Sequence, residues 1–122
     1  MLANWDLTDK LDSPGAYLGR QVINGLLAVP GGPWTTPYSA ADPVHTPSGL
    51  DTSKPAVGLA LSNAVTYMNG KGIPLDAKWR DYQYVTKAGE KIPIPGGPGG
   101  QGVFNVISAS RDSETGHYDS IA

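Results

Sequence analysis

The sequence predicts an α+β fold, with helices in residues 1–72 and strands in residues 80–122. Three observations indicate this division. Apolar residues recur at helical spacing in 16–28 and again after Pro55, side chains alternate along 80–86, and 103–108 is a nearly continuous apolar run. A length of 122 residues fits one small domain or a piece of a larger one, so we expect a single unit over residues 1–122.

The first expected helix covers residues 16–28. We expect Ser13 to cap it and Pro14 to occupy its first position, because these residue types suit the start of a helix. Gly19 and Gly25 each weaken the helix by about 1 kcal/mol relative to alanine. The apolar residues at helical spacing nevertheless favour a helix over a loop.

The second expected helix opens at Pro55 and stops at Gly70 and Gly72. Its apolar positions follow one face, which we expect to be buried: Val57, Leu61, Ala64, Val65 and Met68. Between the two helices, residues 29–50 are rich in proline and lack periodicity. We expect this segment to be extended and irregular and to wrap against other protein surface, since long unstructured loops are uncommon in compact domains.

The second half is expected to be mostly strand and loop. In order, we expect a strand over 80–86, a turn over 87–90, a return strand over 91–94, a glycine-rich loop over 95–102, a strand covered on both faces over 103–108 and a polar loop over 110–119. Pro93 confines the return strand to an edge. A further strand is expected to begin at Ser120.

Composition disfavours several functional classes. Nine basic and eleven acidic residues are scattered along the chain, so no basic face for nucleic acid is visible. No apolar run is long enough to span a membrane, and the first residues lack the features of a secretion signal. The chain has no cysteine. Neither His45 nor His117 lies in a metal-ligand pattern, and no residue pattern predicts a cofactor.

The motifs that suggest chemistry have stronger structural explanations. The glycine-rich loop lacks the Gly-Lys-Ser/Thr ending of a phosphate loop and is more typical of a turn than of an active-site wall. His117, Asp119 and Ser120 contain the residue types of a catalytic triad, but a triad is assembled in space around an oxyanion hole. A polar loop that returns to a strand is the favoured interpretation.

Several segments, taken in order, resemble the C-terminal part of the β-chain of the penicillin acylase family, which includes acyl-homoserine-lactone acylases. The matching segments are Trp5-Asp6, Asp12-Ser13, Gly15-Ala16, the 42–50 turn, the helix after Pro55, Pro74–Trp79, Gln83–Val85, Gly89–Ile94 and Gly96–Ile107. Pro95 stands where the family often has histidine, and Trp79-Arg80 stands where it has Trp-Gly. The resemblance covers nearly the whole chain.

The resemblance implies a fragment of the layered αββα fold of N-terminal-nucleophile hydrolases. These enzymes cut linear amide bonds, including those of antibiotics and quorum signals, with a serine at the start of the β-chain. That serine has no counterpart here, so the fragment is expected to be inactive alone, with no catalytic residue and no cofactor. The candidate substrate-wall residues are Gly96, Gly97, Gly99, Trp79 and Asn105.

The resemblance also implies partners and a location. The partners are the α-chain and upstream β-chain of the acylase and an acyl amide substrate, with no nucleic acid and no membrane. The location is the periplasm or the cell exterior. The isolated chain is expected to self-associate or exchange strands, because it would leave apolar surface and strand edges open.

Two other functions stay open. The chain could be a stand-alone module that binds an acyl or aromatic ligand with its 96–102 loop, Trp79 and Tyr84. It could also be an independent hydrolase that uses His117 and Ser120. The segment hypothesis is favoured because it rests on an ordered succession of motifs rather than on one residue.

Overall fold

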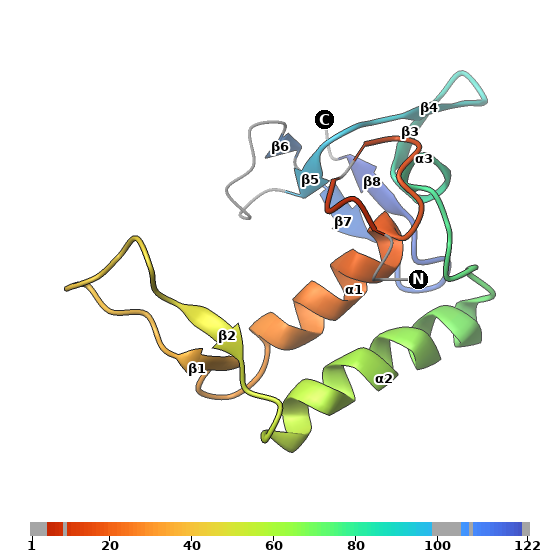
Figure 1. The fold of residues 1–122 in the computed structure, drawn as a ribbon. Coiled ribbons are helices and arrows are strands. Elements are labelled where there is room, and N and C mark those ends of the chain that lie inside the picture. Colours follow the sequence, from red (N-terminus) through yellow and green to blue (C-terminus); the bar gives the residue numbers. More distant parts are fainter. Residues whose placement is uncertain (1–4, 9, 99–105, 108, 121–122) are drawn as a thin grey trace. The chain divides into compact units, whose positions relative to one another are not determined.

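The computed structural model describes the chain except residues 1–4, 9, 99–105, 108 and 121–122. The chain forms two compact units, one of residues 1–19 with 68–122 and one of residues 20–67. Three helices and eight short strands make up the described part, which is an α+β arrangement as predicted (Figure 1). The strands form four two-stranded sheets, three antiparallel and one parallel, among the described residues.

Helix α1 spans Ala16–Leu27, close to the predicted bounds, but the prediction for its start is wrong. The Ser13 hydroxyl donates to Asp6 Oδ1 at 2.7 Å instead of capping the helix. Pro14 forms an isolated bridge with Lys78 rather than the first helical position. Gly15, at φ 85°, supplies the carbonyl for the first helical hydrogen bond, because glycine adopts positive φ without strain.

The unit of residues 20–67 is built on the packing of α1 against α2. Gly25 lets the two helices approach closely, since a Cβ at this position would lie 3.1 Å from the Ala60 Cβ. Val22 of α1 and Val57 of α2 are buried in this unit. The glycine that weakens α1 in isolation therefore lies at a tight contact between the two helices.

Helix α2 spans Pro55–Lys71, and its start is as predicted. The buried apolar positions are Val57, Ala60, Ala64 and Met68. The prediction that Leu61 lies on the buried face is wrong, since Leu61 is 45% exposed. Gly70 lies inside the helix, whereas Gly72, at φ 68°, ends it, and the Ile73 N–H bonds to the Met68 carbonyl.

The proline-rich segment between the helices contains a small sheet where irregular structure was expected. Strand β1 (Trp34–Thr36) pairs antiparallel with β2 (Ser48–Leu50), with Trp34 opposite Leu50. The Asp51 N–H bonds to the Pro33 carbonyl and closes the base of this hairpin at 2.8 Å. Prolines lie beside these short strands and not within them, so the ladder donors are kept.

The predicted hairpin is present, with a correction at its start. Residues Trp79–Tyr82 form a short helix, α3, instead of the first part of a strand. Strand β3 (Tyr84–Lys87) then pairs antiparallel with β4 (Glu90–Pro93). Ala88 and Gly89 make the two-residue turn, both at positive φ.

The glycine-rich loop and the polar loop are also partly ordered as strands. Strand β5 (Gly97–Pro98) pairs in parallel with β6 (Val106–Ile107). Most of the predicted 103–108 strand, residues 103–105 and 108, lies outside the described residues. The polar loop expected over 110–119 is instead a hairpin of β7 (Ala109–Arg111) and β8 (Tyr118–Ser120).

Candidate functional site

The carbonyl oxygen of Gly96 is held by two side chains at the start of the glycine-rich loop. The Trp79 indole N–H donates to it at 3.0 Å, and the Gln83 amide donates to it at 2.7 Å. Gly96 itself has φ 98°, which glycine adopts readily. Because the peptide unit is planar, holding this carbonyl also fixes the direction of the Gly97 N–H, where β5 begins.

Gln83 is the second anchor of this loop and is fully buried. Its amide nitrogen donates to the Ile94 carbonyl at 2.8 Å as well as to Gly96. Carbonyl oxygens only accept, so these two contacts fix which end of the amide is the nitrogen. The Oε1 atom then faces away from them, is buried and has no hydrogen-bond partner among the described residues. The Ile94 N–H returns a bond to the Gln83 carbonyl, so this strand end is held from both sides.

An aromatic cluster buries Trp79 in the unit of residues 1–19 and 68–122. The Trp79 ring lies 5.3 Å from the Tyr118 ring and 6.3 Å from the Tyr17 ring, between centroids. Tyr17 also lies 5.0 Å from Tyr82 and donates its hydroxyl to the Gly116 carbonyl. Burial, with a smaller effect of the Asp81 charge, raises the pKa of Tyr82. The cluster holds Trp79 in the orientation that reaches Gly96.

Polar contacts tie α3 to the segment before α1. The Arg80 guanidinium bonds to both carboxylate oxygens of Asp12, at 2.8 and 3.1 Å, and the Arg80 N–H bonds to the Leu11 carbonyl. The Arg80 hydrogen bonds lower the pKa of Asp12, with smaller effects of the Arg80 and Lys78 charges. The bidentate geometry fixes the direction of α3 and so supports Trp79.

The N-terminal motif residues form a second network in the same unit. Asp6 Oδ1 accepts from the Ser13 hydroxyl and from Thr8, and these hydrogen bonds, Ser13 first, lower the pKa of Asp6. The Trp5 indole donates to the Thr8 carbonyl at 3.1 Å. The Trp5 ring lies so close to Gly19 that a Cβ there would overlap it. Gly19 is therefore a contact surface for Trp5.

The structure brings together three of the five candidate substrate-wall residues. Trp79 bonds to Gly96 at the loop start, and Gly97 is the next residue along the chain. Gly99 and Asn105 lie outside the described residues. Trp79 is fully buried, so its side chain supports the loop from within. Gln83 lies in the matching Gln83–Val85 segment but was not predicted as a site residue. Its further signal was a polar residue within a stretch of aromatic and β-branched residues.

The two histidines take part in separate local networks. The His117 ring stacks on Tyr84, with centroids 4.4 Å apart, and its Nδ1 lies 3.2 Å from the Thr115 hydroxyl. Lys91 lies over the same Tyr84 ring at 4.8 Å. His45 contacts Asp42. In the part of the chain that the structure describes, no three acidic, histidine or cysteine side chains gather as metal ligands would. Within those same residues, no helix has the length and apolar character needed to cross a membrane.

Comparison with known proteins identifies long acylases that contain a similar segment. The chain is 36% identical over 119 residues to acyl-homoserine lactone acylase PvdQ from Pseudomonas syringae pv. syringae, covering 93% of the chain. It is 32% identical over 112 residues to acyl-homoserine lactone acylase PvdQ from Pseudomonas fluorescens Pf-5, and 32% identical over 111 residues to aculeacin-A acylase from Actinoplanes utahensis, each covering 88% of the chain. No protein-family model matches the chain.

The chain spans only 13–15% of the length of these three relatives. With 119 residues aligned, the likeness extends through the described parts of both compact units. The chain is therefore homologous to a segment of penicillin-acylase-family proteins.

Proposed function

We propose that this chain is a supporting segment of an amide hydrolase of the acylase type. The whole enzyme would cleave the C–N bond of a linear acyl amide, with water added across the bond to give an acid and an amine. Its nucleophile would be an N-terminal serine outside these 122 residues, and the α-chain and upstream β-chain would complete the site. The observation that carries the proposal is the match to acylases over 88–93% of the chain.

The geometry at Gly96 supports a positioning role for the segment. Trp79 and Gln83 both donate to the Gly96 carbonyl and so hold the first residues of the glycine-rich loop. We propose that the backbone of Gly96 and Gly97, with Gly99 and Asn105, forms a wall beside the acyl amide. Trp79 and Gln83 would act as positioning residues behind that wall, since neither is accessible to a ligand from solvent.

The burial of Trp79 favours this function over the stand-alone ligand-binding module. In that alternative Trp79 holds an apolar ligand, but its ring is covered by Tyr17 and Tyr118 and its N–H bonds to Gly96. The same layered enzyme would place the segment in the periplasm or outside the cell, in keeping with its lack of cysteine. Cell fractionation followed by immunodetection of the polypeptide tests this location.

A chimera tests the proposed function. In the P. syringae acylase, the homologous segment is replaced by this chain, and release of acyl acid from an acyl-homoserine lactone is measured. We expect the chimera to hydrolyse the substrate and a version without the segment to be inactive. Within the chimera, Gln83→Leu should lower kcat, whereas Gly58→Ala, which alters an open position on α2, should leave it unchanged. A folded chimera without hydrolysis would contradict the proposal.

A further inference from the structure

Residues 34–50, which we call the arm, form an ordered surface with no core of its own. The arm consists of β1, β2 and the connection between them (Figure 1). No residue from 34 to 50 is buried. Among the described residues, β1 and β2 pair only with each other, so both are edge strands. A two-stranded hairpin alone is marginally stable in water. Burial of side chains within the arm therefore contributes little to its stability.

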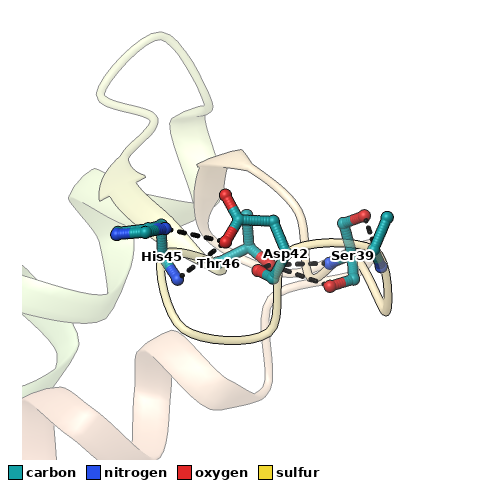
Figure 2. Close-up of polar contacts among 5 residues, drawn as sticks. Ser39, Asp42, His45 and Thr46 are labelled. Carbon is teal, nitrogen blue, oxygen red and sulfur yellow. Dashed lines mark hydrogen bonds and ion pairs between the residues drawn. The ribbon is translucent and has the colours of Figure 1, made fainter.

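The tip of the arm, residues 39–46, is nevertheless held by hydrogen bonds among its own residues (Figure 2). Thr46 Oγ1 accepts from the Ser39 N–H at 2.8 Å and donates to the Asp42 carbonyl at 2.6 Å. Asp42 Oδ1 accepts from the His45 ring at 2.7 Å. Ser39 Oγ accepts from the Ala41 N–H at 3.3 Å. In these contacts polar groups of the tip form hydrogen bonds with one another, and the bonds fix the conformation of the tip.

Beside the exposed Asp42–His45 pair, the arm presents three large apolar side chains to solvent. Val44 is 84% exposed, Tyr38 63% and Leu50 46%. Asp42 is the only acidic residue between 34 and 50, there is no lysine or arginine there, and the Asp42 carboxylate is paired with His45. A fixed, nearly uncharged loop that exposes aromatic and aliphatic side chains is typical of the centre of a protein interface.

We propose that the arm is an interaction surface that packs against apolar surface of the same acylase polypeptide, in the part outside these 122 residues. This inference rests on the proposed function. The similarity to P. syringae acylase covers 93% of the chain and so runs through the arm, yet the segment is only 15% of that acylase. The remaining polypeptide would supply the cover from within the same molecule.

We expect the arm to be covered by its own polypeptide rather than by a second copy of the chain, because a tethered surface is present at the higher effective concentration. A tethered surface acts at an effective concentration of about millimolar, far above the concentration at which separate copies meet. The lack of basic residues in the arm also disfavours nucleic acid and anionic lipid as occupants. The occupant is therefore an apolar protein surface, and the residues that contact it are Tyr38, Val44 and Leu50.

Hydrogen exchange in the acylase chimera tests whether the rest of the polypeptide covers the arm. We expect arm amides to exchange about tenfold or more slowly in the folded chimera than in the isolated 122-residue chain. Val44→Asp should lower the melting temperature of the chimera but leave that of the isolated chain unchanged. Thr66→Asp, which adds the same charge at an exposed position of α2, should change neither.

Three results would overturn the inference. The arm amides could exchange equally fast in both proteins, Val44→Asp could have no effect on the chimera, or the folded chimera could dimerise through its arm. A chimera with a protected arm and no hydrolysis would count against the proposed function but not against the arm. If the chimera fails to fold, the same exchange measurement on the native polypeptide from its source cells decides the question.

Discussion

The indole N–H of Trp79 and the carbonyl oxygen of Gly96 are joined by a 3.0 Å hydrogen bond across the start of the glycine-rich loop. This bond connects the aromatic cluster around α3 to the backbone that the acylase resemblance singles out. Gln83 donates to the same oxygen, so the loop start is held by two donors from adjacent parts of one short stretch.

The two donors on Gly96 should be energetically coupled. Trp79→Phe and Gln83→Leu should each lower the free energy of unfolding by about 1–3 kcal/mol. The double variant should lose more than the sum, by about 1 kcal/mol, because only then does the Gly96 carbonyl lose both donors. Urea unfolding of the four proteins measures this coupling. Strict additivity would show that the shared oxygen does not link the two side chains.

Two helical glycines should respond to alanine with opposite signs. Gly19→Ala should destabilise the chain by about 1–3 kcal/mol, because its Cβ would overlap the Trp5 ring. Gly58→Ala should stabilise it by about 0.5–1 kcal/mol, since nothing lies near that position and alanine favours the helix. Thermal unfolding of both variants checks the pair. A stabilising Gly19→Ala would mean that Trp5 does not pack there.

Acid should destabilise the fold through a set of exposed carboxylates. Hydrogen bonds lower the pKa of Asp6, Asp12, Asp51 and Asp112, the main donors being Ser13, Arg80, Ser53 and Thr115 respectively. Their stabilisation is fully present above the unfolded pKa of 3.8 and is lost as the pH falls through the lower folded values.

Urea unfolding at a series of pH values measures this loss. The free energy of unfolding should be nearly constant above about pH 5 and should fall below about pH 4. Asp12→Asn should reduce the acid-dependent part, because it removes the carboxylate that Arg80 stabilises. An unchanged acid profile in that variant would show that the Arg80 pair makes no contribution.

Alkaline pH should act on Tyr82. Burial raises its pKa above 10.0, so its phenol group should ionise later than the exposed tyrosines in an ultraviolet absorbance titration. A raised folded pKa gives stability that is present below the unfolded pKa of 10.0 and is lost as the pH rises through the folded value. Tyr82→Phe should reduce the amplitude of the late-ionising component. An unchanged amplitude in the variant would assign the component to another tyrosine.

The helices were the part of the fold that could be predicted from sequence. Apolar spacing placed α1 and α2, and Gly72 ended α2 as a residue suited to positive φ. Spacing could not choose between Ala60 and Leu61 for the buried face, because an approach as close as that of Gly25 selects the smaller side chain. The Ser13 cap failed because Asp6 competes for the hydroxyl.

The short strands were predicted less well. Ala88-Gly89 marked the β3–β4 turn, but the tyrosines at 82 and 84 suggested strand alternation where α3 makes one helical turn. The β7–β8 hairpin lacks an apolar signal, since the Asp112 carboxylate organises its turn by accepting from Thr115 and Glu114. Local polar bonding of this kind leaves no periodic pattern in a sequence.

Part of the candidate site followed from sequence through Trp79 and the glycines. The pairing of Trp79 with Gly96 could not be predicted, because it joins residues whose distance depends on how α3 and β4 end. Gln83 was missed for the same reason, since an amide in a strand-like stretch is usually exposed. Here it is fully buried and bonded to two carbonyls.

We propose that this chain acts as one segment of a longer acylase polypeptide. Intact mass and N-terminal sequencing of the native polypeptide that contains it, isolated from its source cells, test this proposal. We expect a chain several times heavier than 12.8 kDa that begins with serine. A native product of 12.8 kDa that begins at Met1 would contradict it.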